Sequence, residues 1–174
     1  MNAAVAALCE RLDVHVELLD TLVGATQEQL QGLLGYRPDG RESAATLAAV
    51  NDRIKDLIAA VDHHSAATRE AAETVADAFS VPLDDATGLS QLAERLPAEH
   101  RAAILERVSC VQALAGSLRE LSHVNQLHAR RGLQVVAAWW SIVGDGESAP
   151  ATYTAKGRAH FTVPTSTGSL TLNI

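Results

Sequence analysis

Residues 2–34 decide the fold, and they read NAAVAALCERLDVHVELLDTLVGATQEQLQGLL. The apolar side chains that recur mostly three or four positions apart are Val5, Leu8, Leu12, Val16, Leu19, Val23, Leu30 and Leu33. This heptad-like spacing places them along one stripe of a helix, which is buried by packing against partner helices. Residues 35–40 contain two glycines and a proline, a pattern that ends a helix. Residues 2–34 therefore predict one long amphipathic helix of a bundle.

A second segment, from Glu42 or Ser43 to Phe79, repeats this helical periodicity. Its apolar stripe is weak over residues 63–67, where we expect local fraying or a bend. The segment ends at a break over residues 80–88, which contain a proline and a glycine. We therefore expect a second long helix that precedes a loop.

The longest helical segment begins at Pro97 and ends near Val143, and a short helix over residues 89–95 precedes it. Proline is best tolerated at the start of a helix, which supports this beginning. Three positions of its apolar stripe are polar or small, namely Asn125, His128 and Gly132. A polar residue in such a stripe weakens self-packing and often sets the choice of partner.

The composition agrees with long helices. Ala, Leu, Glu, Lys and Arg make up 69 of the first 143 residues, whereas the whole chain of 174 residues has only six aromatic side chains. Such a composition is typical of long helices and coiled coils. It disfavours a β-sandwich and a disulfide scaffold, and the aliphatic content argues against wholesale disorder.

These elements predict an all-α fold, an elongated antiparallel bundle of three long coiled-coil-like helices with a short extra helix. Residues 144–174 are rich in Gly, Thr and Ser, and their apolar residues alternate only weakly. Isolated alternation this short does not make a stable sheet. We therefore place a helical bundle domain at residues 1–143 and a flexible C-terminal tail at residues 144–174.

The net charge of −7 argues against nucleic acid as a partner, because phosphate contacts need a basic face. Residues 144–174 have a net charge of zero, so the negative charge lies in residues 1–143. No apolar run approaches the ~18 residues of a membrane span, and the acidic start does not fit a signal peptide. We expect a cytoplasmic protein that does not insert into a membrane.

A search for catalytic patterns finds no phosphate-binding loop, no metalloprotease motif and no nucleophile elbow. Cys9 and Cys110 form no CxxC pair, and we interpret both as small apolar helix residues. His123 and His128 diverge by about 140° around a helix, so we expect the histidines to be solvated or half-buried. We predict no enzyme activity, no cofactor and no metal, and a helical-bundle enzyme or metal protein is the least supported alternative.

The end of the longest helix differs from the rest. Residues 133–143 read LQVVAAWWSIV and contain both tryptophans of the chain. Their apolar side chains surround much of the helix, so two interpretations are open. This stretch is either the well-packed end of the bundle or an apolar surface that receives an amphipathic helix of another protein. Tryptophan is enriched among the residues that contribute most to binding.

Three motifs in order resemble a known family. Residues 96–101 read LPAEHR, residues 118–125 read LRELSHVN, and residues 151–158 read ATYTAKGR, which contains a Tyr-x-x-x-Gly-Arg element. Together with the N-terminal leucine heptads, this order is similar to that of the FlgN-like flagellar export chaperones. The resemblance covers most of residues 8–158, and Thr154 stands where the family often has a glycine.

The resemblance implies a cytoplasmic chaperone that binds the C-terminal helical segments of flagellar hook-associated proteins, which form the hook–filament junction. Such a chaperone prevents premature assembly and delivers its substrate to the type III export gate. The family's substrate-binding region matches the last long helix, where the implied contacts are Leu118, Leu121, Asn125, His128, Val135, Val136, Trp139 and Ile142. Tyr153 matches the tyrosine that contacts the cytoplasmic domain of the export gate, although a loop tyrosine packed on the bundle is the alternative.

The main alternative function is that of a structural or scaffolding coiled-coil protein, which would homo-oligomerise through its heptad stripes. Stable self-association and no binding to junction proteins would favour that alternative. Weak self-association is compatible with either function.

Overall fold

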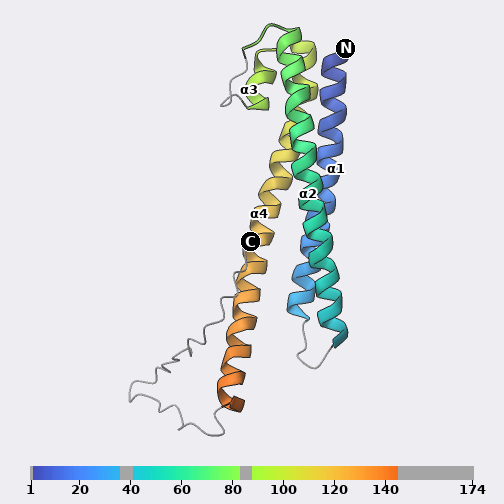
Figure 1. Cartoon of the computed structure of the whole chain (residues 1–174). Helices are drawn as coiled ribbons and strands as arrows, with labels where there is room; N and C mark the ends of the chain where they lie inside the picture. Colours follow the sequence, from blue (N-terminus) through green and yellow to red (C-terminus); the bar gives the residue numbers. More distant parts are fainter. Residues whose placement is uncertain (1, 36–40, 83–87, 145–174) are drawn as a thin grey trace, which may run out of the picture. The chain divides into compact units, whose positions relative to one another are not determined.

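The computed structural model describes residues 2–35, 41–82 and 88–144, and these ranges form four helices (Figure 1). The helices are α1 (Ala3–Leu34), α2 (Arg41–Ala78), α3 (Leu89–Glu94) and α4 (Ala98–Gly144). The predicted all-α class, with three long helices and one short helix, is confirmed. The expected fraying at residues 63–67 is wrong, because α2 is an uninterrupted helix there, and the alternative of a bend stays a prediction. The predicted flexible tail lies outside the described residues.

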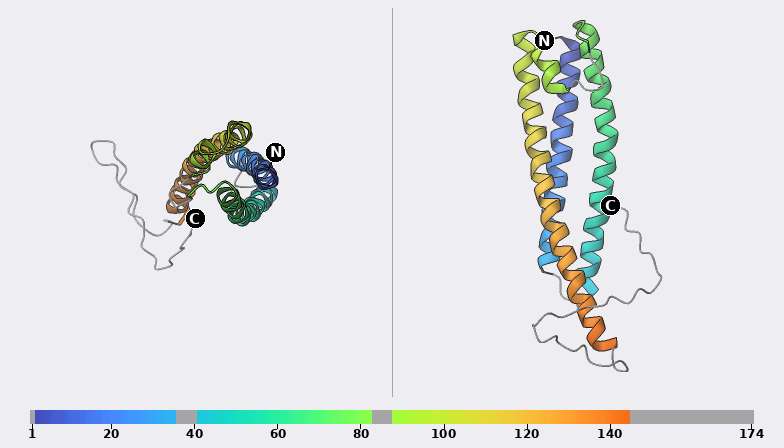
Figure 2. Two further views of the ribbon diagram at one scale, coloured as in Figure 1. Left: turned by 90° about the horizontal axis from the view of Figure 1, so that it is seen from above. Right: turned by 90° about the vertical axis from the view of Figure 1, so that its left-hand side faces the viewer.

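The chain divides into two units, and the boundary falls within α4 between Gly132 and Leu133. Unit 1, Met1–Gly132, contains α1, α2, α3 and most of α4. In this unit successive long helices run in opposite directions, and α1 lies beside both α2 and α4 (Figures 1 and 2). The antiparallel bundle predicted from the heptads is therefore confirmed for unit 1. The domain boundary predicted at residue 143 stays a prediction.

The most tightly packed core lies at one end of unit 1, where the start of α1, the end of α2, α3 and the start of α4 meet (Figure 1). Its fully buried large side chains are Val5, Leu8, Leu12, Val75, Leu92, Leu96 and Ile104. Three of them belong to the stripe predicted for residues 2–34. Farther along that stripe, Val16, Val23, Leu30 and Leu33 are only half-buried. Packing in unit 1 is thus closest at the end that α3 covers.

Local hydrogen bonds explain where α1 begins and where α2 ends. The Asn2 side chain accepts a hydrogen bond from the Ala4 backbone N–H at 2.9 Å, which caps α1. Ser80, with φ 53°, adopts the left-handed conformation beyond α2. Its neighbour Val81 donates its N–H to the Ala76 carbonyl at 2.8 Å, which satisfies a terminal carbonyl and reverses the chain.

Two ion pairs join neighbouring long helices of unit 1. The Arg107 guanidinium on α4 donates to both carboxylate oxygens of Asp13 on α1, at 2.8 and 3.0 Å. This hydrogen bonding raises the pKa of Arg107. Arg53 on α2 donates to Glu28 on α1 at 3.0 Å. Because these side chains are partly exposed, the pairs add little stability.

Two histidines meet in the middle of the bundle. The His64 ring centroid lies 5.8 Å from that of His15, and His64 Nε2 lies 2.7 Å from the Arg11 carbonyl oxygen. His64 and His100 are both buried, so the expectation of solvated or half-buried histidines is wrong for these two. Burial, and secondarily the neighbouring His64, lowers the pKa of His15 below its usual 6.5.

This shift predicts that acidification destabilises the protein. The unfolded chain protonates His15 at its ordinary pKa of 6.5, whereas the folded protein takes up that proton only at lower pH. His15 is therefore neutral in both states well above pH 6.5. As the pH falls below 6.5, protonation of His15 in the unfolded chain lowers the free energy of unfolding. We expect His15→Gln to reduce the loss of unfolding free energy between pH 7.5 and pH 5, as measured by urea titration. His63→Gln, at an exposed position, is the control. An unchanged pH dependence in His15→Gln would contradict this account.

Candidate partner-binding site

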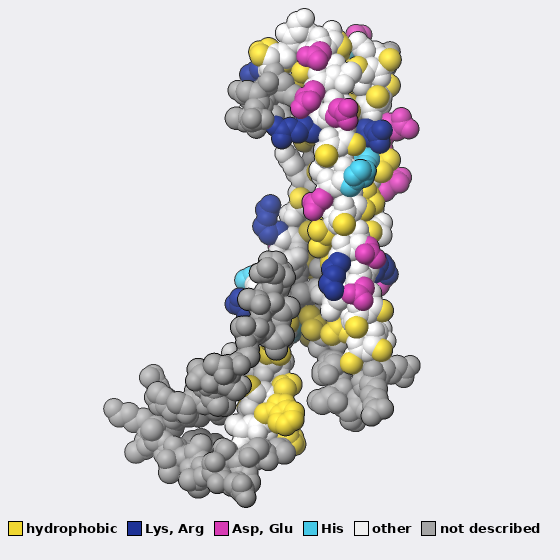
Figure 3. Space-filling model, in the orientation of Figure 1, with side chains coloured by type: hydrophobic (Ala, Val, Ile, Leu, Met, Phe, Trp, Pro, Cys, Tyr) yellow, Lys and Arg dark blue, Asp and Glu magenta, His cyan; other side chains and the backbone are white. Residues whose placement is uncertain are grey.

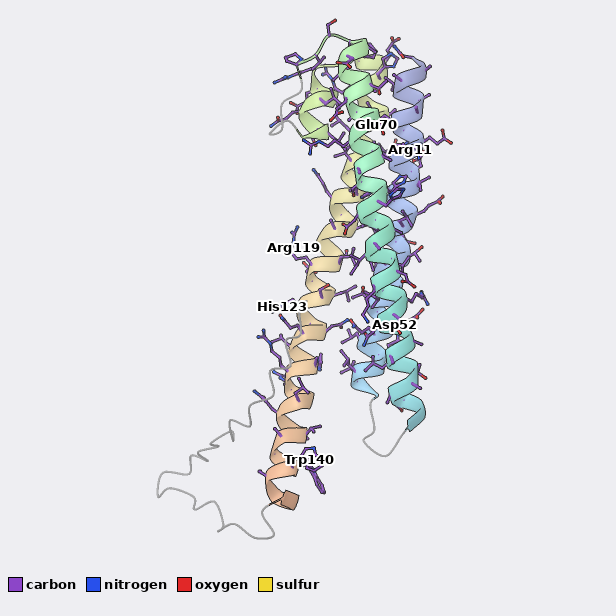
Figure 4. The ribbon with its side chains drawn as sticks, in the orientation of Figure 1. Arg11, Asp52, Glu70, Arg119, His123 and Trp140 are labelled. Carbon is purple, nitrogen blue, oxygen red and sulfur yellow. The ribbon has the colours of Figure 1, made fainter. Side chains whose placement is uncertain are left out.

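The final turns of α4 carry a cluster of exposed apolar side chains. These residues, which we call the apolar end, are Leu133 (66% exposed), Val135 (60%), Val136 (43%), Trp139 (65%) and Trp140 (71%). All five lie in the second unit. Figure 4 shows the Trp140 side chain projecting from the helix. Large apolar side chains that are grouped and exposed mark sites that bind another protein.

The side chains of the apolar end lie on two adjacent faces of α4. Val135 and Trp139 are four residues apart, and so are Val136 and Trp140, so each pair shares a face of the helix. The two tryptophans lie on adjacent faces, about 100° apart. The apolar end can therefore cover a broad strip of a partner helix.

The predicted contacts in unit 1 have a different environment. Leu118, Leu121 and His128 are half-buried, and Asn125 is only 5% exposed. Exposure therefore separates the seven predicted contact residues whose side chains are described into two groups. Ile142 lies in α4, but its side chain is outside the described part of the chain, and so is Tyr153.

Asn125 is bound within the bundle. Its Nδ2 donates to the Thr26 carbonyl at 3.0 Å and to Gln29 Oε1 at 2.6 Å, and both partners lie on α1. Gln29 in turn donates from Nε2 to Asn51 Oδ1 on α2 at 2.7 Å. A short polar chain thus links the three long helices. The stripe pattern identified Asn125 as the unusual residue, but no spacing rule pointed to Gln29 or Asn51 as its partners.

This chain of hydrogen bonds predicts a stability effect. Asn125→Ala leaves the Gln29 Oε1 acceptor without its Asn125 donor in a partly buried position, so we expect a loss of about 1–3 kcal/mol in unfolding free energy. The adjacent exposed Gln126→Ala serves as the matched control, with a change within about 0.5 kcal/mol. Urea unfolding of both variants measures the difference. Equal stability of the two variants would show that the buried amide contributes nothing.

The described residues were also searched for metal sites, reactive thiols and membrane-spanning helices. Among residues 2–35, 41–82 and 88–144, no group of three or more His, Cys, Asp or Glu side chains is arranged to hold a metal ion. Cys9 is buried in the core, and this burial raises the pKa of its thiol. A raised pKa disfavours the reactive thiolate. Cys110 is exposed. No helix in the described part of the chain is long and apolar enough to cross a membrane.

The comparisons with known proteins agree with the resemblance seen in the sequence motifs. The model of the FlgN family, described as FlgN protein, matches residues 1–160. The match includes all four helices and extends past Tyr153. No curated protein and no solved structure matches the chain.

Proposed function

The chain belongs to the FlgN family of flagellar export chaperones, and on that premise we propose that it binds the C-terminal helical segments of hook–filament junction proteins. It keeps these segments from assembling prematurely in the cytoplasm and delivers them to the type III export gate. The observation that carries the proposal is the exposed apolar end of α4.

The apolar end suits this substrate class. The terminal helices of a junction protein are prone to associate before assembly, because the apolar faces that pack against neighbours in the filament are still exposed. An amphipathic helix laid against Val135, Val136 and Trp139 would bury apolar surface on both proteins. Such binding needs no covalent chemistry and no cofactor. Leu118, Leu121, His128 and Ile142 remain further candidate contacts, whereas Asn125 is buried and bonded to α1.

Delivery requires a second contact. We propose that Tyr153 binds the cytoplasmic domain of the export gate, because it occupies the tyrosine position of the Tyr-x-x-x-Gly-Arg element. Substitution to alanine tests this role. Tyr153→Ala is expected to retain substrate binding and to lose capture by the isolated gate domain. Retained capture would remove Tyr153 from the proposal.

The experiment that tests the substrate is a titration of the full chain with a C-terminal fragment of a junction protein, followed by calorimetry and light scattering. We expect a saturable 1:1 complex. A chain that self-associates stably and ignores the fragment would instead be a coiled-coil scaffold. Asn125 donates to Thr26 and Gln29 of the same chain, so this position of the stripe is engaged within the bundle.

A further inference from the structure

Charge is distributed unevenly along the chain. Residues 1–120 contain 19 carboxylates against 10 Lys and Arg, a formal charge of −9. Residues 121–144 contain Arg130 and Arg131 and no carboxylate at all. Glu120 is the last acidic residue before Asp145. An acidic protein thus becomes locally basic over the second half of α4.

Together with Arg119, which lies just before it, part of this region forms a continuous exposed strip on unit 1, which we call the basic strip and define as Arg119, His123 and Arg130. These three side chains lie within about 40° of one another around the helix and span roughly 16 Å along it. All three are exposed. Figure 4 shows Arg119 and His123 pointing away from α1 and α2, and Figure 3 shows basic and histidine side chains on the same side of α4.

The arginines of α4 differ in their partners. Near the start of the helix, Arg107 is paired with Asp13 of the same chain. Arg119, Arg130 and Arg131 contact no carboxylate among the described residues. Their charges are therefore available to a partner.

Exposed apolar residues border the basic strip. Val124 is 36% exposed and Leu127 is 41% exposed, and they lie about 40–140° around the helix from the strip. Arg131 follows Leu127 by four residues and shares its face. Adjacent basic and apolar strips fit a helix that carries carboxylates beside its own apolar side chains. A polar rim of this kind fixes the register of a helix that an apolar surface binds.

We propose that the basic strip binds the carboxylates of an acidic amphipathic helix, and that it selects such helices over basic ones. The inference rests on the proposed function only for the identity of the natural partner, which is the junction-protein segment. A nucleic acid or an anionic membrane fits less well. The −9 charge of residues 1–120 repels a polyanionic surface, and a lipid-binding cluster typically needs about 4–8 Lys or Arg.

The test uses the full chain and a synthetic helical peptide of about 20 residues, with Leu on one face and Glu on the other. Calorimetry at low and high salt gives the dissociation constant. We expect Arg119→Glu combined with Arg130→Glu to weaken peptide binding by about tenfold or more at low salt and to reverse its salt dependence, because the new carboxylates repel the Glu face of the peptide and salt screens that repulsion. The double Arg→Gln variant should give a smaller loss in the same direction.

A matched control separates local from overall charge. Arg11→Glu combined with Lys55→Glu makes the same change in net charge at exposed positions of α1 and α2 and leaves the Arg53–Glu28 pair intact, and it should weaken binding far less. Equal losses in both double variants would overturn the proposal, and so would no binding of the Glu peptide to the native chain. Binding to anionic vesicles in preference to the peptide, or salt-dependent self-association through the strip, would also overturn it. Because the peptide is synthetic, the two proposals can fail independently. A chain that binds the peptide but no junction protein would contradict the proposed function and leave the basic strip as a binding site for acidic helices.

Discussion

Replacing Val135 and Trp139 together with aspartate should weaken binding of the junction-protein fragment by about 100-fold or more. Each of these exposed side chains offers apolar surface on the same face of α4, and central aromatic contacts typically contribute about 2 kcal/mol or more when truncated. A carboxylate at these positions adds a desolvation penalty to the lost contact. Calorimetric titration of the native and variant chains measures the effect.

The control for this variant adds the same two charges to the same stretch of helix. Gln134→Asp combined with Ser141→Asp changes exposed polar positions on either side of the two apolar ones. We expect it to bind within a few-fold of the native chain, and circular dichroism should show equal helix content in both variants. Binding that survives in the Val135/Trp139 variant would place the substrate contact elsewhere.

Leu8→Ala should produce a large loss of stability. The Leu8 side chain is 0% exposed and lies in the core cluster at the α3 end of unit 1. Truncating a buried leucine removes apolar contacts and leaves a cavity that the neighbours fill only partly. Such changes cost about 2–5 kcal/mol.

Leu34→Ala supplies the matched control, because the same substitution occurs in the same helix at a side chain that is 62% exposed. We expect a change within about 0.5 kcal/mol for this variant. Urea unfolding of the two variants and the native chain gives the free energies. Similar losses at both positions would mean that the core is not concentrated where Leu8 lies.

Periodicity was sufficient to predict the helices. The apolar spacing in residues 2–34 and the glycine and proline breaks placed the long helices to within a few residues of their bounds. The stripe does not reveal how deeply each member is buried. Leu8 and Leu33 occupy equivalent positions in the pattern, yet α3 covers the end that contains Leu8, and Leu33 is half-buried. Burial at a given position depends on which distant segments meet there.

The sequence pattern did not predict which residues of different helices contact one another. His64 differs little from His63 in the linear pattern, but the α2 register turns His64 toward α1, where it meets His15 and the Arg11 carbonyl. The partners of Asn125 likewise lie almost 100 residues away in the chain.

The candidate site was predicted in part. The concentration of both tryptophans near residue 140 identified the apolar end, and the structure gives these side chains high exposure. The sequence pattern grouped Asn125 with them because a helical stripe does not distinguish a side chain bound to a neighbouring helix from one left free. Its two hydrogen bonds to α1 make that distinction.

The central claim is that the apolar end of α4 contacts the substrate, and intrinsic fluorescence tests it most directly. The only two tryptophans of the chain are Trp139 and Trp140, and both are exposed. A junction-protein fragment without tryptophan should therefore shift the emission to shorter wavelengths as it binds, and the shift should saturate at one fragment per chain. Calorimetric binding with no change in tryptophan emission would contradict the claim, because the partner would then be bound away from the apolar end.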